Sequence, residues 1–238
     1  MASRDVFLEA LRDFANDLTS RPDPTDVVDS LAVTASQLLA ATAAGVTLVG
    51  TDGGQIFGSA SSETAGELER TQQSSSQGPC HDVIRLRMPV LVDDLSARAD
   101  WPIYRDQAEA MGIRGVMGVP LATDAVALGA LDVYNESPRP WTPDDVAVAL
   151  VLADLTTMVL EYNAQLAEAK RLSAQLQTAL DSRILIEQAK GVLAGELGIE
   201  IDAGFDVLRS HARATRTSLH DLARAVVEDG LRPGPTAD

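Results

Sequence analysis

The sequence has few of the residues on which secreted, membrane-bound and redox-active proteins depend. Cys80 is the only cysteine among 238 residues, so the chain cannot form an internal disulfide or a dithiol redox pair. No apolar run reaches the roughly 18 residues that a membrane-spanning helix needs. The first residues, MASRDVFLEALRDFANDL, mix acidic and apolar side chains and do not resemble a signal peptide. These absences predict a cytoplasmic protein that does not enter a membrane.

Positive charge is also scarce. The chain has 19 Lys and Arg against 35 Asp and Glu, and only Lys170 and Lys190 are lysines. A net charge of −16 argues against a protein that coats nucleic acid through general electrostatic attraction. The charge is unevenly spread, because residues 183–232 hold seven basic and eight acidic side chains. The C-terminal region is therefore nearly neutral on an otherwise strongly acidic protein.

Clustered catalytic residues are missing as well. The sequence shows no nucleophile–base set, no phosphate-binding loop and no receiver-domain aspartate pattern. His81 is the only histidine before residue 211, so a haem or clustered metal site is not expected. The pairs Asp93–Asp94 and Asp144–Asp145 suit a loop and a helix start better than general acid–base catalysis. We therefore expect no enzyme activity, no metal and no tightly bound cofactor.

The first two thirds of the chain show the alternating pattern of a sheet with helices around it. A strand, turn and strand are expected over residues 45–60, and a hairpin over residues 114–136. A further short strand is expected over residues 89–94, and helices over residues 6–18, 25–38, 63–73, 81–87 and 100–112. Thr25 is the expected N-cap of the second helix. The pattern predicts an α+β domain with an antiparallel sheet flanked by helices.

A long helix is expected to follow. Thr142 can cap it, Pro143 suits its first position, and no glycine or proline then occurs before Gly191. Apolar residues recur in steps of three and four, the pattern of a coiled coil. A lone helix cannot bury such a stripe, so we expect a parallel homodimer through a coiled coil over residues 143–182. The stripe consists of Leu152, Leu155, Val159, Tyr162, Leu166, Ala169, Ser173, Leu176 and Leu180.

Two shorter helices complete a C-terminal three-helix unit. The first follows Gly198, with Asp202 as its expected N-cap, and the second begins after Ser218, with Asp221 three residues later. Phe205, Leu208, Ala212 and Thr215 are the expected inward face of the first helix. The resulting domain limits are 1–165 for the α+β domain, 170–230 for the helical unit and 231–238 for a disordered tail.

Gly191 and Gly195 are unusual inside a helix, where each costs about 1 kcal/mol relative to alanine. Close packing against a neighbouring helix and contact with a bound molecule are both open explanations. Arg209, Arg213 and Arg216 lie at i, i+4 and i+7 and so share one face of the next helix. This face is either an ordinary solvated surface or a binding site for a polyanion.

Two stretches resemble known domain families. RILIEQAKGVLAGELGI, AGFDVLRSHARAT and SLHDLARAVV resemble the ANTAR domain, an RNA-binding module of bacterial transcription antiterminators. GPCHDVIRLRMPVLVDDL, WPIYRDQAEAMGIRGVMGVPL and GALDVYNESPRPWTPDDVAVALVLA resemble the GAF sensory domain. Together they resemble the GAF–ANTAR regulators of actinobacteria over almost the whole chain.

The ANTAR resemblance implies binding to a two-hairpin RNA in nascent transcripts, one module per hairpin, which disfavours termination. Recognition of such RNA reads exposed loop bases and contacts phosphates. The residues to which it assigns RNA contacts are Gln188, Lys190, Gly191, Arg209, Arg213, Arg216 and Ser218. The alternative is a non-enzymatic signalling protein whose three-helix end docks a protein partner.

The GAF resemblance implies a pocket for a small molecule that the sequence does not identify. It would lie between the sheet and its covering helices, lined by Cys80, Trp101, Tyr104 and Met117, although core packing explains the aromatic residues equally well. Cys80–His81 is not placed as in bilin-binding GAF domains, because about thirty residues separate it from MGIRGVMGV. A methionine-sulfoxide reductase of this family needs more than one cysteine. We therefore expect neither a bilin nor that enzyme activity.

Overall fold

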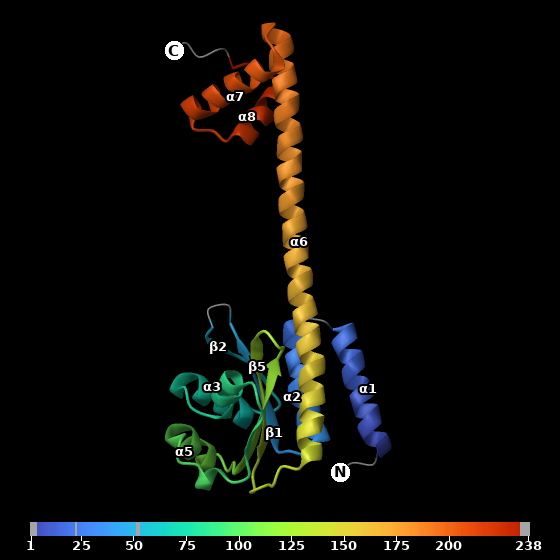
Figure 1. Ribbon diagram of the computed structural model, residues 1–238, viewed down its shortest axis with the longest axis vertical. Coiled ribbons are helices and arrows are strands. Elements are labelled where there is room, and N and C mark those ends of the chain that lie inside the picture. The colour runs from blue at the N-terminus through green and yellow to red at the C-terminus, as the bar shows by residue number, and fades with distance from the viewer. Residues whose placement is uncertain (1–3, 22, 51–52, 234–238) are drawn as a thin grey trace. The chain divides into compact units, whose positions relative to one another are not determined.

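The computed structural model describes residues 4–21, 23–50 and 53–233. The chain divides into two compact units, Met1–Gln165 and Leu166–Asp238, which are described separately (Figure 1). Residues 231–233 have no regular secondary structure, and the rest of the expected disordered tail, 234–238, lies outside the described residues.

A five-stranded antiparallel sheet forms the centre of the first unit. The strands follow the order β2-β1-β5-β4-β3, and every neighbouring pair is antiparallel. This arrangement confirms the predicted α+β class with an antiparallel sheet. The strands are β1 (Ala43–Val49), β2 (Gln55–Ala60), β3 (Val90–Val92), β4 (Gly115–Ala122) and β5 (Ala127–Asn135).

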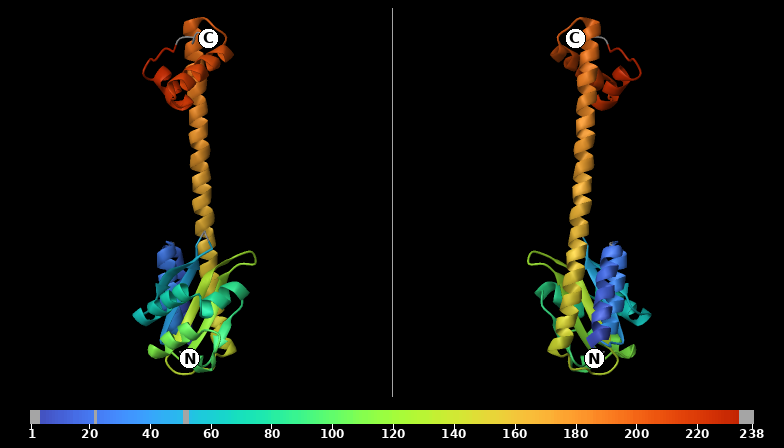
Figure 2. Two further views of the ribbon diagram at one scale, coloured as in Figure 1. Left: turned by 90° about the vertical axis from the view of Figure 1, so that its left-hand side faces the viewer. Right: turned by 90° about the vertical axis from the view of Figure 1, so that its right-hand side faces the viewer.

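Helices cover both faces of this sheet. Two N-terminal helices and the first turns of α6 bury one face, and in the right-hand view of Figure 2 the blue α1 and the yellow part of α6 lie over it. The three helices between β2 and β4 pack on the other face. The helices of this unit are α1 (Arg4–Ser20), α2 (Pro24–Leu38), α3 (Glu63–Ser75), α4 (Pro79–Leu86) and α5 (Pro102–Ala110).

Alternation along β4 and β5 decides which side chains reach which layer. On β5, Leu131 and Val133 join the core under α1, α2 and α6, whereas Ala130 and Tyr134 face α3, α4 and α5. Asp132 shares the second face because side chains two apart point the same way. A carboxylate in the middle of a buried strand is therefore directed into the layer beneath α3 and α4.

The long helix α6 (Pro143–Leu197) is continuous over 55 residues, as its sequence predicted. Its start is capped reciprocally: the Asp145 amide donates to Thr142 Oγ1 at 3.1 Å, and the Thr142 amide donates to Asp145 Oδ2 at 2.9 Å.

The expected apolar stripe of α6 is divided between two environments. Leu152 is fully buried, and Leu155 and Val159 pack beside it in the core of the first unit, so these three are not free to pair with a second chain. Every residue from 164 to 181 is exposed.

Two helix caps differ from the sequence-based prediction. Helix α2 is capped by Asp23, whose side chain accepts from the Thr25 amide at 2.9 Å, because Pro24 takes the first helical position. Helix α7 (Ile201–Thr215) begins after Glu200, so Asp202 lies in its first turn rather than at its cap. In both cases the helix starts earlier than predicted, and the first-turn carboxylate still favours the positive helix end.

The second unit is a small bundle formed by the last turns of α6, α7 and α8 (Leu219–Val227). Gly198, with φ of +64°, ends α6 and allows the chain to turn back. Leu208 and Ala212 are buried as predicted, Phe205 is half-buried and Thr215 is exposed. The core of the bundle is Ala189, Leu193, Leu208, Ala212, Leu222, Ala223 and Val226.

Among the described residues, none of the helices combines the length and the apolar character that crossing a bilayer requires. Even α6, the longest, is interrupted by charged residues throughout its exposed part.

The close approach of β1 and β5 generates a stability prediction. A Cβ at Gly129 would collide with the Thr47 carbonyl oxygen and stand 3.1 Å from Leu48 Cα. We expect Gly129→Ala to lower the free energy of unfolding of the first unit by about 1–3 kcal/mol. Urea unfolding followed by tryptophan fluorescence measures this, because Trp101 and Trp141 both lie in that unit. Gly195→Ala is the control, since its Cβ meets nothing within 4 Å and should leave this transition unchanged.

Candidate functional site

A face of unpaired arginines lies on the second half of α7. Arg209, Arg213 and Arg216 are exposed, and among the described residues none of their side chains forms a hydrogen bond or ion pair. Two arginines of the first unit are paired instead: Arg114 is bidentate on Asp94, and Arg139 pairs with Asp145 at 2.8 Å. Guanidinium groups without carboxylate partners remain available to a phosphate. We call Arg209, Arg213 and Arg216 the arginine face.

The face that carries these arginines is polarised along the helix. Asp202 and Asp206 precede Arg209 on the same side of α7, because steps of three and four return to one face. Both acidic side chains lie toward the positive end of the helix and the arginines toward its negative end. A polyanion on this surface would thus be attracted to the end near the α7–α8 turn.

Lys190 is not part of an open surface. Its side chain is only 11% exposed, and its ammonium group pairs with Glu187 at 2.9 Å and with Asp202 at 3.8 Å. The ammonium group also lies 5.9 Å from the centre of the Phe205 ring. At Gly204 a Cβ would stand 2.8 Å from the Lys190 carbonyl, so α7 crosses α6 in close contact here. Lys190 therefore fastens α7 to α6, and its ammonium group already has two carboxylate partners within the chain.

Gly191 and Gly195 do have open space around them. A Cβ built at either position meets nothing within 4 Å among the described residues. Tight packing within the chain, one of the two open explanations for these glycines, is therefore not seen. Gln188 is exposed three residues before Gly191, on the same side of α6. Gln188, Gly191 and Gly195 therefore form a strip of α6 with few side-chain atoms, which a second molecule can approach closely.

Ser218 has a structural role at the start of α8. Its hydroxyl accepts from the Asp221 amide at 3.0 Å and donates to the Asp221 carboxylate at 2.6 Å. Arg216 forms the left-handed C-cap of α7, two residues earlier. The α7–α8 turn thus places Ser218 next to the arginine face. No hydrogen bond or ion pair among the described residues joins Gln188 or Gly191 to this group.

The predicted ligand-pocket residues do not form a single site. Cys80, Trp101 and Tyr104 are buried under α3, α4 and α5, with the Trp101 and Tyr104 rings edge to face at 6.0 Å between centroids. Met117 is buried on the opposite face of the sheet, in the core under α1, α2 and α6. Its neighbour Val116 points into the layer of Trp101 and Tyr104. Met117 is therefore excluded from the pocket by the alternation of the strand.

A buried polar cluster that the sequence did not predict lies in the same layer. Gln72 links two other members of the cluster. Its side-chain NH2 group donates to Asp132 Oδ2 at 2.8 Å, and its side-chain carbonyl oxygen accepts from the backbone amide of Cys80 at 2.9 Å. Glu69 accepts hydrogen bonds from the Tyr134 hydroxyl at 2.6 Å and the Thr47 hydroxyl at 2.7 Å. We call Glu69, Gln72, Cys80, Asp132 and Tyr134 the buried cluster.

Burial changes the acidity of these groups. Desolvation raises the pKa of Glu69 and of Asp132, and their mutual repulsion raises that of Asp132 further. The pKa of the Cys80 thiol is also raised, first by burial and then by the charges of Asp132 and Glu69. Cys80 is therefore a protonated thiol and not a reactive thiolate, which argues against direct redox sensing.

Two signals in the sequence point to this cluster. Asp132 interrupts the apolar strand ALGALDVYN, and a charged residue between buried neighbours needs partners. Glu69 and Gln72 lie three residues apart on α3, on the side that also carries Ala65 and Leu68. A sequence reading that treats the polar run ELERTQQ as a solvated surface misses them.

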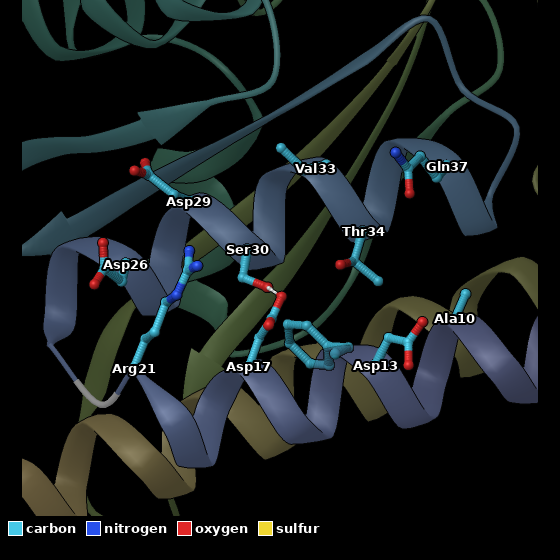
Figure 3. Close-up of a pocket in the computed structure, with 11 residues that line it drawn as sticks. Ala10, Asp13, Asp17, Arg21, Asp26, Asp29, Ser30, Val33, Thr34 and Gln37 are labelled. Atoms are coloured by element: carbon cyan, nitrogen blue, oxygen red, sulfur yellow. Dashed lines mark hydrogen bonds between the residues drawn. The ribbon is translucent and has the colours of Figure 1, made fainter.

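The open groove between α1 and α2 has a different character (Figure 3). It encloses about 420 Å³ and is lined by Asp13, Asp17, Asp26 and Asp29, with Arg21 the only basic side chain in its lining. The Ser30 hydroxyl donates to Asp17 Oδ2 at 3.3 Å across it. Four carboxylates against one guanidinium repel phosphate, so this groove is not a nucleic-acid site.

Two domain families match the chain. The model of the GAF domain family matches residues 23–160, more than half of the sequence. The model of the ANTAR domain family matches residues 174–227. The first range covers the sheet and the buried cluster, and the second covers the arginine face, Lys190 and Ser218. No curated protein matches the sequence.

Solved structures show the same fold for the first unit at low sequence identity. The free methionine-R-sulfoxide reductase from Neisseria meningitidis matches with 19% identity and a TM-score of 0.54, covering 69% of this chain and 95% of that one. The GAF domain of an Acinetobacter phosphoenolpyruvate-protein phosphotransferase matches with 15% identity, a TM-score of 0.52 and coverage of 68% and 98%. A bacteriophytochrome from R. palustris matches with 14% identity and a TM-score of 0.57, covering 78% of this chain but 43% of that one.

The packing of Lys190 leads to a prediction that separates structure from RNA contact. Lys190→Ala removes the stem beside Phe205 and leaves Glu187 and Asp202 without their cation, so we expect the second unit to lose about 1–3 kcal/mol of stability. Thermal melting by far-UV circular dichroism measures the loss, as a helical transition not accompanied by a change in tryptophan fluorescence.

Lys170→Ala is the matched control, because the only other lysine lies on the exposed part of α6 and should change melting little. Unchanged melting of Lys190→Ala together with weakened RNA binding would contradict the structural assignment and return Lys190 to the RNA surface.

Proposed function

The chain belongs to the GAF domain family and carries an ANTAR domain after it, and on this premise we propose that it is a signal-responsive regulator that binds RNA and prevents transcription termination. The RNA is a pair of hairpins in a nascent transcript, and binding stabilises it against the competing terminator. No side-chain set suited to catalysis is needed for this role.

The arginine face carries the proposal. Three guanidinium groups without partners lie on one side of α7, on a protein whose net charge is −16. Guanidinium groups that no carboxylate of the described residues occupies can bind phosphates, and each such contact releases counterions from the RNA.

Base contacts would come from other parts of the same unit. Gln188 offers an amide to base edges, and Gly191 and Gly195 let a backbone or base lie close to α6, since no side chain is present. The second unit has no exposed aromatic residue among its described residues, so stacking on aromatic side chains does not contribute. Hydrogen bonds and phosphate contacts therefore dominate the proposed interface.

We further propose that the protein acts as a parallel homodimer through α6. Leu176 and Leu180 are 62% and 52% exposed on a stretch whose every side chain faces solvent. An isolated helix of this length is only marginally stable in water, and pairing two copies buries the stripe. The stripe available for pairing is Tyr162, Leu166, Ala169, Ser173, Leu176, Leu180 and Ile184. A dimer presents two ANTAR domains, one for each hairpin.

RNA binding by the arginine face is tested with the full chain and RNA recovered by crosslinking in the host cell. We expect Arg213→Gln to weaken binding and to reduce the slope of log affinity against log salt by about 1, because one phosphate contact is lost. Arg209→Gln and Arg216→Gln should act in the same direction.

Arg171→Gln is the control, since Arg171 already pairs with Glu168 at 2.6 Å. Affinity that does not change with salt, together with no effect of the three substitutions, would instead favour a protein-docking role for the helical unit.

Pairing through α6 is tested by introducing charges into the apolar stripe. Leu176→Asp with Leu180→Asp places carboxylates in the interface, and we expect sedimentation to show monomers. Ala174→Asp with Thr178→Asp has the same spacing on the opposite side of the helix, where both residues are exposed, and should leave the dimer intact. An unchanged mass for the first variant would overturn the pairing.

A further inference from the structure

Three side chains of metal-ligating type meet inside the GAF domain. One carboxylate oxygen of Glu69, the sulfur of Cys80 and one carboxylate oxygen of Asp132 all lie within 4.8 Å of one another. The residues come from α3, α4 and β5 and are completely buried. Around a zinc ion such donors are separated by about 3.3–3.8 Å, as follows from Zn–O and Zn–S bonds of about 2.0–2.3 Å. Small side-chain movements therefore bring the set to the geometry of a coordinated ion.

Two polar atoms at this place lack partners. Asp132 Oδ1 and the Tyr104 hydroxyl are buried, and neither forms a hydrogen bond of ordinary geometry with the described residues. Burial raises the pKa of the Tyr104 hydroxyl, and the charges of Asp132, Glu69 and Cys80 raise it further. A buried carboxylate oxygen without a donor costs free energy unless a proton or a cation occupies the position. The cluster is thus short of positive charge.

The surroundings hold the carboxylates in place. Asp132 Oδ2 is fixed by Gln72, and Glu69 is fixed by Tyr134 and Thr47. These hydrogen bonds have the form of the outer contacts that orient metal-binding carboxylates. Gly118 provides the necessary space, because a Cβ there would stand 2.7 Å from Asp132 Oδ1 and 2.8 Å from Val83 Cγ2. Glycine at position 118 therefore leaves the space that the Asp132 carboxylate occupies.

We propose that Glu69, Cys80 and Asp132 bind one zinc ion in the core of the GAF domain. Binding releases the thiol proton of Cys80 and any proton held by the carboxyl groups. The ion leaves a single negative charge on the three ionised ligands, where the unliganded groups must stay partly protonated. A thiolate among few oxygen donors selects zinc over magnesium and calcium, which prefer six or more oxygen ligands.

Metal analysis of the full-length protein tests the site. After dialysis against Zn²⁺ and removal of free metal, we expect about one zinc ion per wild-type chain and a melting temperature that rises with zinc concentration. Cys80→Ser and Asp132→Asn should each lose most of the bound zinc. Asp132→Asn keeps the shape of the side chain and removes a buried charge, so it should remain folded by circular dichroism and tryptophan fluorescence.

Cobalt(II) distinguishes this site from adventitious binding. A Co²⁺-loaded wild-type protein should show a thiolate-to-cobalt absorption band that is absent from Cys80→Ser. Asp94→Asn is the control, since this half-buried carboxylate pairs with Arg114, outside the cluster, and should keep both zinc and the band. Less than about one tenth of a zinc ion per wild-type chain would mean that the cluster holds only protons, and equal zinc in Asp132→Asn would mean that the metal binds elsewhere; either result overturns the site. RNA affinity is measured in parallel, so loss of the zinc site and loss of the proposed RNA function remain distinguishable.

Discussion

One helix takes part in two hydrophobic cores, and neither core closes without it. Ala149, Leu152 and Ala153 of α6 pack in the core of the GAF domain, and Ala189 and Leu193 pack in the ANTAR bundle. Between these parts the helix has no buried residue from 164 to 181. Backbone hydrogen bonds and a few local side-chain contacts, such as Arg171 with Glu168 and Gln177 with Asp181, hold that stretch. Its exposed apolar side chains are the physical basis for the pairing proposed above.

The apolar pattern along α6 runs through two parts of the helix that have different surroundings, so the pattern alone did not show which of its side chains are buried. Steps of three and four along α6 predicted one continuous seam, yet Leu152, Leu155 and Val159 belong to the GAF core while Leu176 and Leu180 face solvent. Periodicity identifies the apolar face of a helix but does not identify what covers it. The two domains and the antiparallel sheet were predictable because turn signals, glycine stops and hydrophobic alternation all agreed.

Individual site residues were harder to predict, for reasons that differ from residue to residue. Lys190 looked like a surface cation, and its burial depends on the packing of α7, which brings Gly204 and Phe205 against it. Met117 lies one position from Val116, and a shift of one residue on a strand reverses the face. Glu69 and Asp132 are far apart in sequence, so the pairing of two buried acids could not be seen before β5 and α3 were placed. The sequence did not show which residues far apart along the chain lie next to each other in the fold.

The bare stretch of α6 also sets a concentration scale for the protein. At low copy number a single chain exposes residues 164–181 to any protease that can bind an unshielded, fraying helix. In the pair proposed above, the two helices would cover the same peptide bonds, so protection of this stretch from proteolysis would increase with the concentration of the protein.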